Sequence, residues 1–304
     1  KSTKLLLKER EFIKKYKPWG IILFSRNIMN IKQAKKLTLS IRKIFKDSKY
    51  PILIDQEGGR INRLKNIISF SNLTSEFFGN KFISKPNEFI FFYNLFIDKT
   101  SYLLKLIGVN INTSPVLDLR IKGSSNVIGD RSFSKNPRIV SKIGDYCISH
   151  YHKNRIATVI KHIPGHGLAK VDSHLFTPVV NKNLNYLLKN DFYSFKNKKS
   201  LFAMTAHVIF KKIDSKNTVT HSKKMISLIR NRIGFKNILI SDDLSMKSLK
   251  DDLKTNTIKT FSAGCNLALH CNGKLSEMKV VGDNSPKLSK FIIKKTSLFY
   301  KILS

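Results

Sequence analysis

Short apolar runs rich in β-branched residues recur along the chain and alternate with longer amphipathic segments. Each run is followed by a polar or glycine-containing stretch before the next helical pattern begins. Runs of this kind are typical of buried strands, and segments with apolar residues every three to four positions are typical of helices. The pattern predicts seven strands, at residues 20–24, 52–54, 109–112, 157–160, 201–204, 237–240 and 266–269.

Helical patterns fill the intervals between these runs. The main helix predictions are residues 5–15, 31–45, 89–107, 139–154 and 223–233, with a terminal helix of basic surface over 274–304. Strands that alternate with helices form parallel βαβ units. The chain has no linker rich in Pro, Gly or Ser and no internal repeat, so we expect residues 1–304 to form a single α/β domain.

The number of strands favours an α/β fold of the (β/α)8 TIM-barrel type, with one strand unaccounted for. The first strand of the barrel is then missing from the N-terminus, or residues around 2–6 supply a short one. A doubly wound open sheet is the competing fold. Its usual signature, GxGxxG after the first strand, is absent from this chain.

The chain is strongly basic, with 56 Lys and Arg residues against 20 Asp and Glu and a formal net charge of +36. A charge of this size would ordinarily suggest nucleic acid or an anionic surface as a partner. Arginine supplies only 11 of the cationic groups, however, and the lysines are spread over the whole chain. A general lysine bias therefore explains the charge, and a basic nucleic-acid-binding protein remains only the non-enzyme alternative.

The cysteine and hydropathy patterns indicate a reduced, cytoplasmic protein. The three cysteines, Cys147, Cys265 and Cys271, cannot all pair within one chain, and none has a CxxC spacing. The most apolar stretch, residues 89–97, is far shorter than the roughly 20 residues of a membrane-spanning helix. We therefore expect no membrane span.

Ionisable groups follow nearly every predicted strand. Active sites of barrels form at the carboxyl ends of the strands, so these groups are candidates for the chemistry. Asp55 and Asp242 taken singly could be helix N-caps. In a chain so rich in lysine, an arginine indicates a position where the planar guanidinium group is needed. This group can bind hydroxyls or carboxylates in bidentate fashion, which a lysine cannot do. The strand-end groups are Asp55, Glu57, Arg60, Arg63, Lys161, His162, His207, Asp242, Asp243 and His270.

The densest cluster lies in residues 161–174, which hold three of the eight histidines. One interpretation is a metal site formed by His162, His166, Asp172 and His174, but the spacing matches no standard zinc motif. The favoured interpretation is a mobile loop on which Asp172 orients His174. A carboxylate partner fixes the tautomer of an imidazole and suits it to proton transfer near neutral pH.

A proton-transfer pair on a loop together with a carboxylate at another strand end suggests double displacement. In a retaining glycosidase one carboxylate attacks the anomeric carbon, and a second group acts first as acid and then as base. Most such enzymes use two carboxylates. Of the six glutamates here only Glu57 follows a predicted strand, so an Asp–His dyad replacing the usual acid is consistent with the sequence.

Several motifs in order along the chain carry a family resemblance. They are GIILFSRNI (20–28), IDQEGGRINR (54–63), GVNINTSPVLDL (108–119), IGDRSF (128–133), VIKHIPGHG (159–167), VDSH (171–174), AMTAH (203–207) and ISDDLSM (240–246). With them the sequence resembles the family 3 glycoside hydrolases, specifically the single-domain bacterial β-N-acetylglucosaminidases (β-N-acetylhexosaminidases) of peptidoglycan recycling.

The resemblance implies a TIM barrel and a retaining hydrolase with no metal or other cofactor. It implies that Asp242 is the nucleophile, that His174 is the acid/base and that Asp172 is its dyad partner. The pocket for the terminal N-acetylglucosamine (GlcNAc) would be lined by Asp55, Arg63, Arg131, Lys161 and His162. The implied substrates are peptidoglycan fragments in which GlcNAc is joined to N-acetylmuramic acid or its anhydro form.

Two enzymatic alternatives remain open. A histidine acid/base repels phosphate less than a glutamate would, so the chain could be a β-N-acetylglucosaminide phosphorylase. It could also be a broader β-glycosidase of the same fold.

Overall fold

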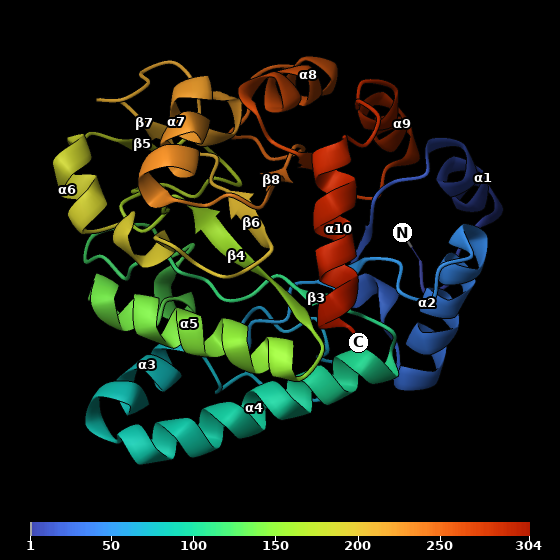
Figure 1. Ribbon diagram of the computed structural model, residues 1–304, viewed down its shortest axis with the longest axis horizontal. Helices are drawn as coiled ribbons and strands as arrows, with labels where there is room; N and C mark the ends of the chain where they lie inside the picture. Colours follow the sequence, from blue (N-terminus) through green and yellow to red (C-terminus); the bar gives the residue numbers. More distant parts are fainter. Residues whose placement is uncertain (1) are drawn as a thin grey trace.

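The computed structural model describes residues 2–304, which form a parallel sheet surrounded by helices (Figure 1). The strands of the main sheet are β1 (Ile21–Leu23), β2 (Ile52–Ile54), β3 (Ile111–Asn112), β4 (Ala157–Ile163), β6 (Phe202–Thr205), β8 (Ile238–Asp243) and β9 (Leu267–Leu269). They are all parallel and lie side by side in this order. All seven predicted strands are present, with their ends shifted by at most three residues.

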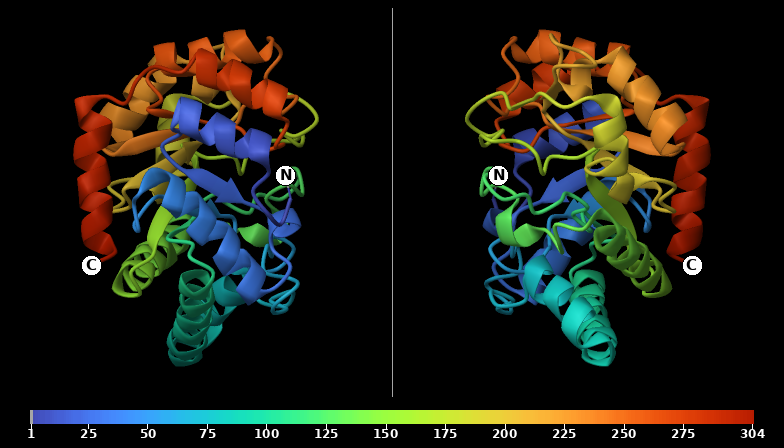
Figure 2. Two further views of the ribbon diagram at one scale, coloured as in Figure 1. Left: turned by 90° about the vertical axis from the view of Figure 1, so that its right-hand side faces the viewer. Right: turned by 90° about the vertical axis from the view of Figure 1, so that its left-hand side faces the viewer.

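Helices lie around this sheet. They are α1 (Leu7–Tyr16), α2 (Ile31–Phe45), α3 (Ser75–Ser84), α4 (Pro86–Leu106), α5 (Pro137–Lys153), α6 (Leu184–Lys189), α7 (Lys223–Leu228), α8 (Leu253–Ala263), α9 (Leu275–Asp283) and α10 (Lys290–Ile302). Figure 2 shows α1 and α2 on either side of β1, with α4 and α5 at one end of the molecule and α8 and α9 at the other. The βαβ organisation expected from the sequence is therefore confirmed.

Two helix predictions need correction. Residues 274–304 form two helices rather than one, because Asn284 ends α9, Pro286 cannot continue it, and Ser289 caps the start of α10. The helix that begins at Lys223 changes to a π-helical turn over Ile229–Ile233 and ends at Gly234, whose φ is +81°.

A two-stranded parallel sheet of β5 (Val179–Val180) and β7 (Ile209–Phe210) was not predicted, because two-residue strands are too short to show a hydrophobic pattern.

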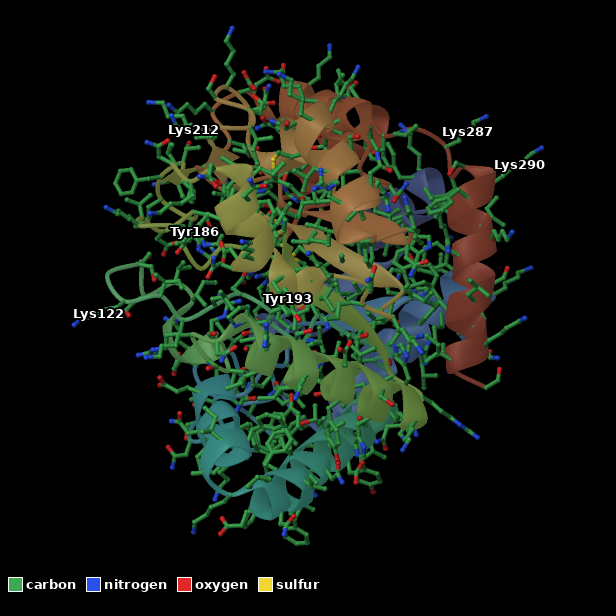
Figure 3. The ribbon with its side chains drawn as sticks, turned by 60° about the vertical axis from the view of Figure 1, so that its left-hand side comes forward. Lys122, Tyr186, Tyr193, Lys212, Lys287 and Lys290 are labelled. Atoms are coloured by element: carbon green, nitrogen blue, oxygen red, sulfur yellow. The ribbon has the colours of Figure 1, made fainter. Side chains whose placement is uncertain are left out.

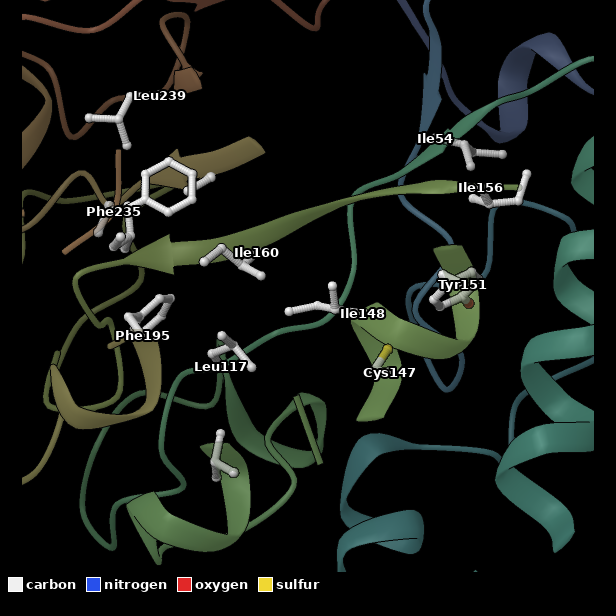
Figure 4. Packing of buried hydrophobic residues seen from close by; sticks show 14 of the residues in the cluster. Ile54, Leu117, Cys147, Ile148, Tyr151, Ile156, Ile160, Phe195, Phe235 and Leu239 are labelled. Carbon is white, nitrogen blue, oxygen red and sulfur yellow. The ribbon is translucent and has the colours of Figure 1, made fainter. Parts of the chain in front are cut away.

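The two faces of the sheet bury different apolar clusters, as the two-residue period of a strand requires. Ile52 and Ile54 on β2 face the helices, whereas Leu53 between them faces the interior of the curled sheet. On β4, Ile160 lies in the outer cluster with Leu117 and residues of α5 (Figure 4). The interior cluster includes Phe202, Ile292 and Phe299, so α10 packs its apolar side against this inner layer.

The sheet is not closed within the described residues, because β1 and β9 form its two edges. A largely apolar cavity of about 590 Å³ lies between these edges. Residues 2–6 form no strand. Instead, the Ser2 carbonyl accepts a hydrogen bond from Asn27 Nδ2 at 2.9 Å. The prediction of a barrel-like sheet one strand short of closure is thus confirmed, and the alternative that residues 2–6 complete it is wrong.

The positive charge lies mainly on the surface. Lysines such as Lys122, Lys212, Lys287 and Lys290 extend away from the body of the molecule (Figure 3). Among residues 2–304 only two lysines are buried, Lys161 and Lys198, and both are ion-paired. No helix in this part of the chain combines the length and hydropathy needed to cross a membrane.

Candidate active site

The carboxyl ends of the strands surround a pocket of about 150 Å³. Seven of the eight site residues predicted from the sequence line it: Asp55, Arg63, Arg131, Lys161, His162, His174 and Asp242. The eighth, Asp172, lies outside the lining and reaches the pocket through His174. The structure therefore brings together side chains that are up to 187 positions apart, between Asp55 and Asp242.

Irregular strand ends explain how consecutive residues line the same pocket. In a regular strand neighbouring side chains point to opposite faces. The register of β4 against β6 shifts between Lys161 and Ile163, and that of β8 against β9 shifts between Ile240 and Asp243. Such irregularities re-aim side chains. Lys161 with His162, and Asp242 with Asp243, can therefore all face the pocket.

A buried network of charges forms one wall of the site. Lys161 Nζ lies 3.1 Å from Asp55 Oδ1 and 2.6 Å from Glu57 Oε1. The guanidinium of Arg131 donates to both oxygens of Glu57, at 2.8 and 2.9 Å, and Arg63 Nη2 donates to Asp55 at 3.3 Å. Neither carboxylate serves as a helix N-cap. The bidentate arginine contact predicted from the sequence is made here to a protein carboxylate, that of Glu57. It holds the two side chains in a fixed orientation.

Both carboxylates of this wall stay ionised. Burial alone would raise the pKa of Asp55 and of Glu57. The charges of Lys161 and Arg63 outweigh that effect and hold the pKa of Asp55 far below its usual range. For Glu57 the charges of Arg131 and Lys161 lower the pKa to about 2. Glu57 was among the strand-end candidates of the sequence, but no role in the site was assigned to it there.

Another buried carboxylate, Asp118, supports the histidines of the KHIPGHG motif. Asp118 is fully buried and lies 2.7 Å from His162 Nδ1, and it accepts the backbone N–H of His166 at 2.7 Å. Burial would raise the pKa of Asp118, but the charges and hydrogen bonds of the two histidines lower it. An ionised Asp118 can only accept, so His162 carries its proton on Nδ1 and presents Nε2 to the pocket. Asp118 also escaped prediction, despite lying in the motif at 108–119.

Asp242 is the carboxylate of the pocket with the fewest internal partners. Its Oδ1 accepts the N–H of Asp243 at 2.8 Å, and within the described residues Oδ2 has no hydrogen-bond partner. Burial would raise the pKa of Asp242, but His162, His207 and Lys161 lower it. Asp243, by contrast, accepts from Ser245 Oγ and from the N–H of Cys271, and so stabilises the turn. The free oxygen of Asp242 is thus an ionised group available to attack a ligand.

The Asp172–His174 pair lies on the turn above the pocket. His174 Nδ1 is 2.7 Å from Asp172 Oδ1, which also accepts the N–H of His174 at 2.8 Å. Burial would raise the pKa of Asp172, but these hydrogen bonds from His174 lower it, so the carboxylate is ionised beside the imidazole. The side chain of His174 is 63% exposed, which allows proton exchange with solvent. The geometry is that of a carboxylate-oriented proton shuttle.

The four residues considered as metal ligands have separate partners. His162 is bonded to Asp118, His166 Nε2 to Ser173 Oγ, and His174 to Asp172. Within residues 2–304 no group of three or more His, Cys, Asp or Glu side chains has the arrangement of a metal site.

One more buried carboxylate, Asp191, lies against the KHIPGHG motif. A Cβ atom at Gly165 would lie 2.7 Å from Asp191 Cγ, and one at Gly167 would lie 2.9 Å from Asp191 Oδ1, so the motif needs glycine to approach this side chain. Burial raises the pKa of Asp191 to about 8, and the charge of Asp118 adds to the effect, while the N–H groups of Gly167 and Leu168 oppose it. Asp191 is therefore mostly protonated at neutral pH.

Replacement of this carboxyl is expected to remove a pH-dependent loss of stability. Asp191 ionises near pH 3.9 in the unfolded chain but only near pH 8 when folded. Its contribution is present below pH 4 and is lost as the pH rises to 8, by something on the order of 5 kcal/mol. Asp191→Asn should therefore raise the free energy of unfolding at pH 8 by about 2 kcal/mol or more relative to its effect at pH 5. Urea unfolding at both pH values measures this, and equal effects at the two pH values would contradict it.

Comparison with known proteins identifies relatives along nearly the whole chain. Residues 2–290 match the model of the glycosyl hydrolase family 3 N-terminal domain. The chain is 32% identical over 285 residues to a β-hexosaminidase of Hydrogenovibrio crunogenus, covering 92% of this chain and 79% of that protein. It is 34% identical over 260 residues to a β-hexosaminidase of Neisseria gonorrhoeae, covering 83% of this chain and 71% of that protein.

Solved structures of related enzymes have the same fold as this chain. The crystal structure of NagZ from Neisseria gonorrhoeae in complex with N-trifluoroacetyl-D-glucosamine is 26% identical, with a TM-score of 0.84, and the match covers 98% of this chain and 87% of NagZ. A family 3 β-N-acetylglucosaminidase from Paenibacillus shares the fold with a TM-score of 0.86 at 24% identity.

Proposed function

This chain belongs to glycosyl hydrolase family 3, and from that premise we propose that it is an exo-β-N-acetylglucosaminidase that retains anomeric configuration. Its relatives are β-hexosaminidases, and one structural relative binds a GlcNAc analogue. The observation that carries the proposal is the pocket in which Asp242, with one free carboxylate oxygen, and the Asp172–His174 pair line or border the same small space.

In the proposed first step, an oxygen of Asp242 attacks the anomeric carbon while the glycosidic bond breaks. The departing oxygen takes a proton from His174, and the sugar is left esterified to Asp242. In the second step, His174 removes a proton from water, whose oxygen displaces Asp242 from the anomeric carbon. The ionised Asp172 stabilises the imidazolium and fixes the ring by accepting from Nδ1.

The charged wall suits the binding of sugar hydroxyls. Asp55 and the Nε2 side of His162 present a charged acceptor and a ring nitrogen to the pocket, and hydrogen bonds to charged groups are the stronger ones. We assign the terminal GlcNAc to this wall, with Asp55, Arg63, Arg131, Lys161 and His162 as binding residues. Arg131 and Lys161 act partly by holding Glu57 and Asp55 in place.

We further propose peptidoglycan fragments as the substrates, in which GlcNAc is linked to N-acetylmuramic acid or its anhydro form. Muramic acid and its peptide carry carboxylates, and the surface lysines of a chain with net charge +36 attract anionic ligands. Hydrolysis of such fragments would take place in the cytoplasm. The unpaired cysteines agree with a reducing compartment.

Loss of the proton shuttle should be measurable on its own. We expect His174→Ala to lower kcat for phenyl β-GlcNAc by about 10²–10³-fold, the usual contribution of general acid–base catalysis. Azide needs no base to attack the glycosyl-enzyme, so it should accelerate turnover of an activated aryl substrate by this variant. Wild-type rates in His174→Ala, or no response to azide, would contradict the assigned role.

The activity itself is tested by the turnover of aryl β-GlcNAc against aryl β-glucoside, with and without phosphate. The proposal predicts a clear preference for the GlcNAc substrate and release of free GlcNAc in both buffers. GlcNAc-1-phosphate as the product would instead establish a phosphorylase, and equal turnover of the glucoside would establish a broader β-glycosidase. Absence of turnover on both substrates would overturn the proposal.

A further inference from the structure

The turn that carries the Asp172–His174 pair is joined to the protein body through the residue between them. The side chains of Asp172 and His174 are 37% and 63% exposed, whereas Ser173 is only 3% exposed. Ser173 Oγ lies 3.0 Å from Nε2 of His166, which is itself 3% exposed. One buried hydroxyl therefore separates two exposed catalytic candidates.

The other hydrogen bonds of this turn are internal. Asp172 accepts the N–H groups of Leu175 and Phe176 on its carbonyl, at 3.0 and 2.9 Å, and that of His174 on its side chain. Within residues 170–176, all of which the structure describes, the bond from Ser173 to His166 is the one that reaches outside the turn. The internal bonds fix the shape of the turn, but this bond fixes its position over the pocket.

His166 is a firm support for such a bond. Its N–H donates to the buried Asp118 at 2.7 Å, and its carbonyl accepts from Ala169 at 3.1 Å. Gly165 and Gly167 on either side pack so closely on Asp191 and on the Leu119 carbonyl that no Cβ would fit. The imidazole therefore has little freedom to shift, and the turn bonded to it is held relative to Asp242 and the pocket.

The ring is also in a protonation state that suits a hydrogen bond with a hydroxyl. Burial lowers the pKa of His166 to about 4, with a further lowering by His162, although Asp118 and Asp242 oppose this. A neutral ring can hydrogen-bond to the Ser173 hydroxyl at Nε2 in either tautomer, as acceptor or as donor. Nδ1 has no hydrogen-bond partner among the described residues.

From this arrangement we propose that His166 is a positioning residue for the reaction: through its bond to Ser173 it holds the turn that aims the Asp172–His174 pair at the glycosidic oxygen. The inference rests on the proposed function of that pair. His166 acts through Ser173 and takes no part in the proton transfer itself. Misplacement of an acid/base group lowers the chemical step more than the binding of substrate.

The test compares Ser173→Ala and His166→Leu with a matched control, Ser200→Ala. Ser200 Oγ donates a buried hydrogen bond to the Thr158 carbonyl at 2.6 Å, at the opposite ends of their strands from the pocket. With phenyl β-GlcNAc, which needs proton donation, kcat of each positioning variant should fall about tenfold while KM changes less than twofold. The glycosylation step of the 2,4-dinitrophenyl substrate, followed as a pre-steady-state burst, should change little, because that leaving group needs no acid.

Three further comparisons separate positioning from a general loss of structure. The double variant should be no slower than the slower single variant, because both changes remove one bond. His166→Gln, whose amide can reach the Nε2 position, should recover most of the kcat. Hydrogen exchange of the amides of residues 172–176 should accelerate in Ser173→Ala but not in Ser200→Ala.

Unchanged kcat and unchanged exchange in Ser173→Ala, or losses that multiply in the double variant, would overturn the inference. Because hydrogen exchange does not depend on activity, it tests the Ser173–His166 hydrogen bond separately from the proposed enzymatic function. A wild-type protein inactive on both aryl substrates would refute the proposed function. Faster exchange in Ser173→Ala would still show that the Ser173–His166 hydrogen bond holds the turn in place.

Discussion

Asp242→Ala is expected to lower kcat for aryl β-GlcNAc substrates by at least about 10⁴-fold without unfolding the protein. The side chain has one free oxygen, and although burial would raise its pKa, interactions with His162, His207, the Asp243 N–H and Lys161 lower it. No other carboxylate of the pocket can replace it: Asp55 and Glu57 are bonded to cations, and Asp243 holds its own turn. The loss should therefore fall on kcat for every leaving group.

The matched control for this variant is Asp252→Ala. Asp252 caps α8 by accepting from the N–H of Thr255, so its removal should lower stability slightly and leave kcat unchanged. Azide added to Asp242→Ala should occupy the space of the lost carboxylate and give a glycosyl azide of inverted, α configuration. A variant that keeps more than a tenth of the wild-type rate would show that Asp242 is not the nucleophile.

Lys161→Met is expected to impair both stability and substrate binding. Its ammonium group lies between Asp55 and Glu57. Its removal takes one ion-pair partner away from each of these two buried carboxylates. Breaking a buried ion pair from one side typically costs about 3–5 kcal/mol. The disturbed wall should also lower kcat/KM for aryl β-GlcNAc by about 10²–10³-fold, because a misplacement of 1 Å alone can cost about 10²-fold.

The pH dependence of this loss has a definite sign. In the wild type the folded-state pKa values of Asp55 and Glu57 are lowered, so their contribution to stability is present at neutral pH and is lost as the pH falls toward 2. Without Lys161 the carboxylates protonate more readily. The difference in free energy of unfolding between wild type and Lys161→Met should therefore be largest at pH 7 and shrink toward pH 3.

Lys198→Met provides the matched control for a buried lysine outside the site. Lys198 Nζ lies 2.7 Å from Asp145 Oδ2, but the Asp145 side chain is 56% exposed and can be solvated without its partner. This variant should lose less stability than Lys161→Met and should keep its kcat/KM. An equal loss of stability in the two variants, or a loss that does not change with pH, would contradict the account of the charged wall.

The sequence was sufficient to predict the strands and their polar ends, because buried parallel strands leave continuous β-branched runs. Residues 52–54 and 31–45 were predicted with the observed bounds. What escaped prediction depends on contacts between distant segments. Asp118 follows β3 but supports histidines on β4, and nothing local to residue 118 indicates that partner.

Glu57 and Ser173 show a second reason why part of the site could not be predicted. Glu57 follows a strand like Asp55 does, but its bond to Arg131 joins positions 74 residues apart. Ser173 stands between two residues of recognised chemistry, and only its burial against His166 distinguishes it from an ordinary loop serine. The irregular ends of β4 and β8 likewise decide which side chains face the pocket, and they arise from pairing in the folded sheet.

The central claim is the covalent intermediate on Asp242, and trapping it is the most direct measurement. The protein would be incubated with a 5-fluoro derivative of β-GlcNAc fluoride, which slows both steps but keeps a reactive leaving group, and then digested and mapped by mass spectrometry. The account predicts one sugar adduct, on the peptide and the side chain of Asp242. An adduct on another carboxylate, or turnover of substrate with inversion and no adduct, would contradict it.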